Sequence, residues 1–114
     1  MGGYKVHRDQ KQLQADVQAM ETAGAFAVVL ECVPAATATQ ISAQVAIPTI
    51  GIGAGAGCDG QILVINDLLG IPDGNVPKHV KAYAALGEQI VAAVKDFCTD
   101  VRSGKFPAED QAFV

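Results

Sequence analysis

The sequence lacks tryptophan altogether, and aromatic residues make up only 5% of its 114 positions. A stacking platform for single-stranded nucleic acid is therefore not expected. Basic residues are also few, since eight Lys and Arg stand against twelve Asp and Glu and leave a net charge of −4. A chain with this balance carries no electrostatic footprint for binding nucleic acid or an anionic membrane surface.

Paired cysteines and long apolar runs are missing as well. The three cysteines are widely spaced, no CxxC pair occurs, and there are only two histidines. This pattern argues against a zinc site and favours a reducing cytoplasmic setting in which each cysteine is a small buried apolar residue. No apolar run approaches the roughly 20 residues that span a bilayer. We therefore expect a cytoplasmic protein without a membrane or nucleic-acid partner.

The most informative segment is the apolar run of residues 25–30, which ends at Glu31 and is followed by Pro34. A short continuous run rich in β-branched residues predicts a strand buried on both faces, as in a parallel sheet. A buried carboxylate is costly without a partner, but enzymes place charged groups at the C-terminal edge of such sheets. Glu31 is therefore a candidate general base or metal-linked carboxylate. The alternative is that Glu31 caps the helix that begins near Pro34.

Apolar periodicity divides the remaining chain into further strands and helices. The expected strands cover about residues 2–6, 25–32, 47–52 and 61–65, and the expected helices about 10–23, 35–45 and 77–102. This alternation predicts an α/β fold with about four parallel strands. Eight residues join the last two strands, which is short for a parallel crossover, so a hairpin is the alternative there. The predicted elements amount to about half of a (β/α)₈ barrel, which typically needs ~250 residues.

A glycine-rich segment, residues 53–60, joins those last two strands. Gly55–Gly60 fits the GxGxxG pattern, but dinucleotide binding requires a helix to follow, and here a strand is expected. The glycines instead favour close approach by a substrate or by neighbouring backbone, with a purely structural turn as the alternative. Asp67 also follows an expected strand, although Asn-Asp is ordinary turn chemistry. Lys5 and Lys78 are weak candidates for contact with an anionic substrate.

Several long motifs follow one another in an order that is similar to a known enzyme family. They are GGYKV at residues 2–6, AGAF at 23–26, VLECVP at 29–34, IPTIGIGAG at 47–55, CDGQILV at 58–64 and DVRSGKFP at 100–107. On these motifs the chain resembles ketopantoate hydroxymethyltransferase, that is, 3-methyl-2-oxobutanoate hydroxymethyltransferase of pantothenate biosynthesis. The resemblance covers the C-terminal half of that family.

The resemblance implies the C-terminal half of a (β/α)₈ TIM barrel of the phosphoenolpyruvate/pyruvate type, with residues 1–114 as one partial domain truncated at its N-terminal side. It implies a transferase of the coenzyme A pathway that uses 5,10-methylenetetrahydrofolate to hydroxymethylate 3-methyl-2-oxobutanoate, giving 2-dehydropantoate. Glu31 lies in the motif of the family's catalytic base. Ile52 and Ile62 match positions that line the keto-acid pocket. Mg²⁺ and a large homo-oligomer are also implied.

The family's metal-binding aspartates and substrate lysine belong to the half that this chain does not match, so we assign no metal ligand. Asn66 and Gln111 also stand where the family more often has histidine. We expect the chain to be inactive alone and to act as a homo-oligomer or with a complementary N-terminal half. A non-catalytic half-barrel that serves as an assembly or ligand-binding module is the alternative. Open strand edges favour association in either case.

Overall fold

The computed structural model describes residues 5–71 and 74–113. These residues form two compact units, one of residues 5–64 and 77–80, and the other of residues 65–71, 74–76 and 81–113. The expected strand at 2–6 falls largely outside the described residues, and its last two positions are not in a strand. The expectation of a single partial domain remains a prediction.

The first unit contains a parallel sheet with two helices. Its elements are helix α1 (Gln10–Thr22), strand β1 (Val28–Glu31), helix α2 (Ala35–Gln44), strand β2 (Thr49–Ile52) and strand β3 (Gly60–Gln61). The strands pair in the order β1-β2-β3, and both pairs are parallel. The α/β class is thus confirmed, as a three-stranded rather than a four-stranded sheet in the described residues. The hairpin alternative is wrong, because β3 runs parallel to β2.

Both ends of helix α1 follow from local chemistry. The Asp9 carboxylate accepts a hydrogen bond from the Gln12 N–H at 3.1 Å, which satisfies one of the donors that a helix leaves unpaired at its start. Gly24 follows the C-terminal end with a φ of 92°, a conformation that glycine adopts without a steric penalty. The sequence predicted both of these features.

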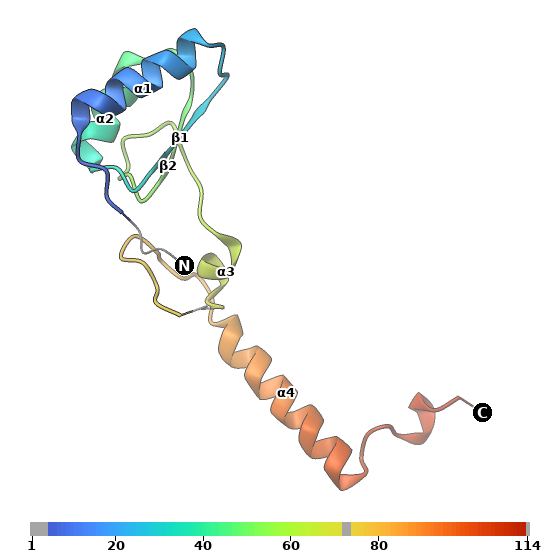
Figure 1. Cartoon of the computed structure of the whole chain (residues 1–114). Coiled ribbons are helices and arrows are strands. Elements are labelled where there is room, and N and C mark those ends of the chain that lie inside the picture. The colour runs from blue at the N-terminus through green and yellow to red at the C-terminus, as the bar shows by residue number, and fades with distance from the viewer. Residues whose placement is uncertain (1–4, 72–73, 114) are drawn as a thin grey trace. The chain divides into compact units, whose positions relative to one another are not determined.

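The core of the first unit lies between the two helices and one face of the sheet, and Figure 1 shows α1 and α2 beside the strands. Val17 of α1, Ile41 of α2 and Leu30 of β1 are each at most 3% exposed. The other buried members of this cluster are Val28, Val33, Ala38 and Ala54. Burial of these apolar side chains is the main favourable contribution to the fold of this unit.

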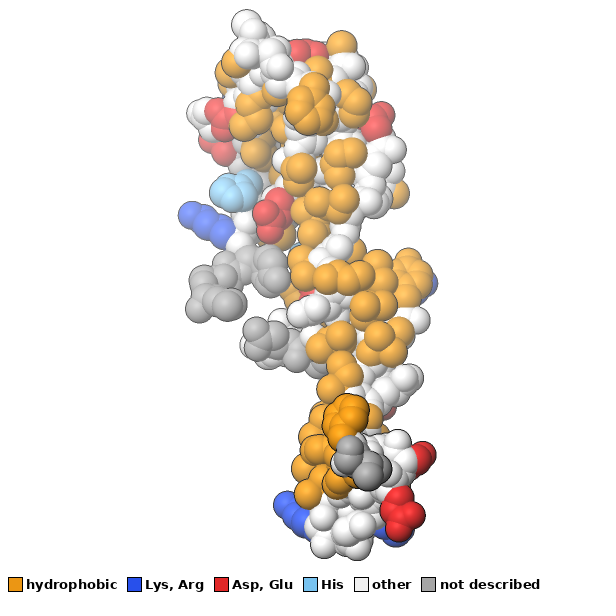
Figure 2. Space-filling model, turned by 90° about the vertical axis from the view of Figure 1, so that its right-hand side faces the viewer, with side chains coloured by type: hydrophobic (Ala, Val, Ile, Leu, Met, Phe, Trp, Pro, Cys, Tyr) orange, Lys and Arg blue, Asp and Glu red, His pale blue; other side chains and the backbone are white. Residues whose placement is uncertain are grey.

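The opposite face of the sheet remains exposed. Along β1, Val28 and Leu30 are buried, whereas Val29 between them is 55% exposed. The prediction of a strand buried on both faces is therefore wrong within this chain, because α1 and α2 cover one face only. Figure 2 shows apolar side chains gathered on a visible face of this unit.

The expected strand at 61–65 is mostly absent. Strand β3 ends at Gln61, although the Ile62 N–H still donates to the Gly51 carbonyl at 3.0 Å. β3 is an edge strand among the described residues, so a longer strand would gain hydrogen bonds on one side only. Helix α3 (Ile65–Leu69) follows, with Asp67 in its first turn, where the helix dipole favours a negative charge.

The second unit contains α3, helix α4 (Leu86–Ser103) and the short 3₁₀ helix η1 (Glu109–Gln111). Helix α4 begins later than the helix expected over 77–102, because backbone groups before it bond to the α3 region instead: the Tyr83 N–H donates to the Leu68 carbonyl at 2.8 Å. Gly104 ends α4 with a φ of 72°, as the sequence predicted. None of the helices in the described part of the chain has the length and apolar character needed to cross a membrane.

Candidate active site

Glu31 is the last residue of β1 and therefore lies at the C-terminal edge of the parallel sheet. Its register partner is Ile52, the last residue of β2. Side chains alternate between the two faces along a strand, and Val28 and Leu30 point toward the helices. Glu31 and Ile52 therefore share the helix-free face. The structure brings the predicted base and one predicted pocket residue together.

Ile62 reaches the same face one strand further along. The pairing of β2 with β3 matches Gly51 with Gln61, and continuing this register by one residue sets Ile62 opposite Ile52. The Ile62 side chain is 50% exposed. The three predicted site residues, Glu31, Ile52 and Ile62, thus lie along one line across the C-terminal edge of the helix-free face.

The backbone after Glu31 turns sharply into helix α2. Cys32 is buried and has a φ of 52°, in the left-handed region that residues other than glycine seldom adopt. The Cys32 N–H donates to the Ile52 carbonyl at 3.0 Å, which holds this turn against the end of β2. Helix α2 starts after Pro34 without a side-chain capping bond. The alternative that Glu31 stabilises the start of this helix through the helix dipole stays a prediction.

The glycine-rich connection packs against helix α2. A Cβ atom at Gly57 would overlap Thr39, and one at Gly55 would overlap Ala35. These glycines therefore allow one part of the chain to approach another closely. Of the two kinds of close approach that the sequence predicted, by a substrate or by neighbouring backbone, this is the second. The element that follows is strand β3 and not a helix, so the context that dinucleotide binding requires is absent.

A hydrogen-bonded ring fixes the register between β2 and β3. The Asp59 carboxylate accepts from the Thr49 N–H at 2.8 Å and from the Thr49 hydroxyl at 3.0 Å, and the Asp59 N–H donates back to the Thr49 hydroxyl oxygen at 3.2 Å. Ser42 of α2 lies 2.6 Å from the same hydroxyl. Because Thr49 is fully buried, this ring satisfies polar groups that would be costly to leave unpaired. These hydrogen bonds join the start of β2 to the residue before β3, and so they support the same register that sets Ile62 opposite Ile52.

The same ring predicts a pH-dependent contribution to stability. The Thr49 N–H, and after it the Thr49 hydroxyl, lower the pKa of Asp59 below its ordinary value. A lowered pKa in the folded state stabilises the fold above the unfolded-state pKa, and this contribution is lost as pH falls through the folded-state pKa. Asp59→Asn should therefore lower the urea midpoint near neutral pH, and the gap to the parent chain should narrow below a pH of about 4.

The matched control for this prediction is Asp96→Asn, at an exposed position of α4. The control should leave the neutral-pH midpoint nearly unchanged, as surface substitutions usually do. A gap between Asp59→Asn and the parent chain that stays constant down to low pH would contradict the role given to the Thr49–Asp59 ring.

Both histidines of the chain lie near the residues that directly follow β1 and β2. The His7 N–H donates to the Cys32 carbonyl at 3.2 Å, one residue beyond Glu31. The His79 ring packs on Gly53, where an added Cβ would lie 2.9 Å from His79 Nδ1. Neither histidine carries a local sequence signal for this position, because long-range topology alone brings them to the edge.

The other predicted acidic residue does not join this edge. Asp67 lies inside helix α3, so its expected place at a strand end is wrong. Among the residues that the structure describes, no three His, Cys, Asp or Glu side chains are grouped to hold a metal ion. Mg²⁺ favours octahedral oxygen coordination, and the single carboxylate of Glu31 does not supply it. The residues of this edge therefore do not form a metal site on their own.

A parallel α/β sheet that presents a carboxylate at its C-terminal edge has the arrangement of barrel-type enzymes. The described strands and helices are consistent with part of such a barrel. Residues 1–109 match the family model described as ketopantoate hydroxymethyltransferase, and the chain belongs to this family.

Curated relatives agree with this assignment. The 3-methyl-2-oxobutanoate hydroxymethyltransferase of Halalkalibacterium halodurans is 53% identical over 116 residues, which cover 98% of this chain and 42% of the relative. The protein of the same name from Syntrophus aciditrophicus is 51% identical over 117 residues, which cover 99% of this chain and 43% of the relative. The chain thus spans less than half the length of these relatives, and it matches their C-terminal part.

Proposed function

We propose that this chain is the base-bearing C-terminal half of a 3-methyl-2-oxobutanoate hydroxymethyltransferase that works in the cytoplasm. The reaction joins C3 of 3-methyl-2-oxobutanoate to the methylene carbon of 5,10-methylenetetrahydrofolate and, with water, gives 2-dehydropantoate and tetrahydrofolate. The observation that carries the proposal is the register pair of Glu31 with Ile52 at the C-terminal edge of the helix-free face. Family membership and the printed names of the relatives support it.

In this proposal Glu31 removes the proton from C3 of the keto acid. The adjacent carbonyl stabilises the resulting enolate. Water releases the methylene group of the folate as formaldehyde and leaves tetrahydrofolate; C3 of the enolate then adds to the formaldehyde carbon, and the formaldehyde oxygen takes a proton to become the new hydroxyl. Ile52 is the register partner of Glu31, and Ile62 follows β3, the neighbour of β2; their apolar side chains would pack against the methyl groups of the substrate. Glu31 is exposed in this chain, so a covering partner must remove water from the carboxylate to make it a stronger base.

We propose that Mg²⁺ also belongs to the complete site and that the other half of the barrel holds it. The described residues at the edge do not fit a metal on their own, since Glu31 is their only carboxylate and no metal-binding group is formed. The steps assigned to Glu31, Ile52 and Ile62 are therefore derived without the metal.

The partner that this proposal requires is a complementary N-terminal half, within a homo-oligomer of complete barrels. The outer strands β1 and β3 each have one strand neighbour among the described residues, and open edges of this kind readily pair with further strands. The helix-free face also exposes apolar side chains such as Val29 and Ile62. Strands of a complementary half would cover both of these features.

Mixing this chain with the N-terminal half that it lacks tests the proposal directly. The chain alone should give no folate-dependent formation of 2-dehydropantoate, because half of the site is missing. Addition of the N-terminal part of the Halalkalibacterium halodurans relative, with Mg²⁺, should produce turnover, and sedimentation should show a complex of the two. A chimera in which this chain replaces the matching segment of that relative tests the same point where the separate parts do not assemble. An assembled but inactive barrel would favour the non-catalytic half-barrel instead.

A further inference from the structure

The connection between β2 and β3 begins directly after Ile52, one of the predicted pocket residues. It consists of residues 53–59 and contains no helix. Parallel strands are usually joined by a longer crossover, whose helix packs onto the sheet. Because this connection lacks such a helix, its position depends on the contacts of individual residues.

The side chain of Gln61 makes one of these contacts. Its Nε2 donates a hydrogen bond to the Gly55 carbonyl at 2.8 Å and closes the connection on itself. A Cβ atom added at Gly51, the register partner of Gln61, would lie 3.0 Å from Nε2 and 3.1 Å from Oε1 of Gln61. The amide therefore lies against the backbone of β2, one residue before Ile52 along that strand.

The same connection also packs against helix α2. A Cβ atom added at Gly55 would overlap Ala35, and one added at Gly57 would overlap Thr39. Ala35 is the first residue of α2 and follows the turn that begins after Glu31. Gly55 is thus held through its carbonyl by Gln61 and touches the start of α2. The hydrogen bond of Gln61 therefore links the end of β3 to the turn after Glu31.

We infer that Gln61 is a positioning residue for the proposed reaction, which acts by holding the connection against α2. The inference rests on the proposed function. Gln61 does not touch the substrate in this account. Its hydrogen bond fixes Gly55, and Gly55 in turn fixes the distances that separate Glu31 from Ile52 and Ile62.

The Thr49–Asp59 ring does not replace this hydrogen bond. It holds the start of β2, whereas Gln61 holds the connection that leaves the end of β2. Without the Gln61 amide the connection is free to move away from α2. A displacement of about 1 Å in an active site can lower a rate by about 100-fold. Because Gln61 is exposed, its replacement should change the stability of the fold little.

Gln61→Met tests this inference in the assembled barrel, because methionine keeps the length of the side chain but removes the donor. The kcat for exchange of the C3 proton of 3-methyl-2-oxobutanoate with deuterium should fall about tenfold or more. The KM for the keto acid should change by less than about threefold, since the loss is one of alignment and not of substrate binding. Gln61→Lys keeps an N–H donor and should recover part of the rate.

NMR of the isolated chain gives a second readout that does not depend on turnover. With ¹³C-labelled isoleucine methyl groups, Gln61→Met should shift the signals of Ile52 and Ile62, which Ile52→Val and Ile62→Val variants assign. Ile90 lies on α4 in the second unit, and its signal should stay in place.

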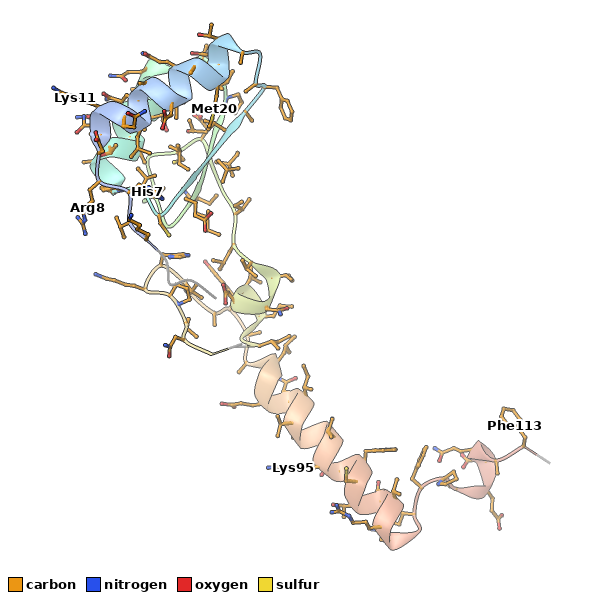
Figure 3. The ribbon with its side chains drawn as sticks, in the orientation of Figure 1. His7, Arg8, Lys11, Met20, Lys95 and Phe113 are labelled. Carbon is orange, nitrogen blue, oxygen red and sulfur yellow. The ribbon has the colours of Figure 1, made fainter. Side chains whose placement is uncertain are left out.

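Gln18→Met is the matched control. Gln18 lies exposed on α1, between Lys11 and Met20, which Figure 3 labels, and this variant should keep the parental kcat. A parental kcat in Gln61→Met, a loss that Gln61→Lys does not recover, or unshifted Ile52 and Ile62 signals would each overturn the inference while the proposed function stands. A parent barrel that assembles without catalysing exchange would instead contradict the proposed function, and the inference would fall with it.

Discussion

Glu31→Gln should lower the rate of 2-dehydropantoate formation by the assembled barrel about 100- to 10,000-fold, the range that a positioned acid or base contributes. Glutamine keeps the size of the side chain but cannot accept the C3 proton. Because Glu31 is exposed at the end of β1 in this chain, the substitution should not disturb the core. The fall should therefore appear in kcat, with little change in the assembly of the two halves.

Glu88→Gln is the matched control for this substitution. Glu88 lies exposed in the first turn of α4 and is not assigned to the site, so the control should retain the activity of the parent barrel. Turnover that survives in Glu31→Gln would remove Glu31 from the mechanism. Equal losses in both variants would point to a general effect of lost negative charge.

Ile41→Ala should destabilise the first unit by about 2–5 kcal/mol, the usual cost of truncating a buried Leu, Ile or Met side chain to alanine. Ile41 is 1% exposed and lies between α2 and the covered face of the sheet. The change removes apolar contacts and leaves a cavity in a small core. Since whole proteins are stable by only about 5–15 kcal/mol, the urea midpoint measured by circular dichroism should fall strongly.

Ile90→Ala provides the comparison for this core substitution. Ile90 lies on α4 and is 48% exposed, so the same chemical change removes much less buried surface in the isolated chain. Its midpoint should shift by a small fraction of the Ile41→Ala shift. Similar shifts in the two variants would contradict the core as described, since both remove the same atoms.

Local signals account for the parts of the fold that the sequence predicted well. Asp9 and Gly24 delimit α1 because capping and left-handed backbone are properties of single residues. The apolar run before Glu31 predicted β1 because β-branched residues favour strands. Its burial was predicted incorrectly because burial depends on whether another element covers each face, and no local pattern carries that information.

Long-range contacts explain the two elements whose bounds were predicted wrongly from the sequence. The helix expected over 77–102 begins only at Leu86, since groups such as the Tyr83 N–H bond to the α3 region. The strand expected at 61–65 ends early because β3 has no second strand neighbour in the part of the chain that the structure describes. At the candidate site, the apolar run before Glu31 pointed to that residue, whereas Ile52 and Ile62 came only from the resemblance to the family.

No local sequence pattern predicted the other contacts at the C-terminal edge of the sheet. His79 is far from Glu31 in sequence and meets Gly53 only through the path of the chain. The ring between Thr49 and Asp59 likewise depends on the parallel register of β2 and β3. A parallel pairing across so short a connection is uncommon. The spacing in the sequence therefore did not exclude an antiparallel hairpin.

Exchange of the C3 proton of 3-methyl-2-oxobutanoate with deuterium, followed by NMR in D₂O without folate, tests the central claim most directly. It isolates proton removal from hydroxymethyl transfer and from folate binding. The assembled barrel with the parent chain should catalyse exchange, and the barrel with Glu31→Gln should exchange no faster than solvent alone. Exchange at the parental rate in the Glu31→Gln barrel would contradict the assignment of Glu31 as the base.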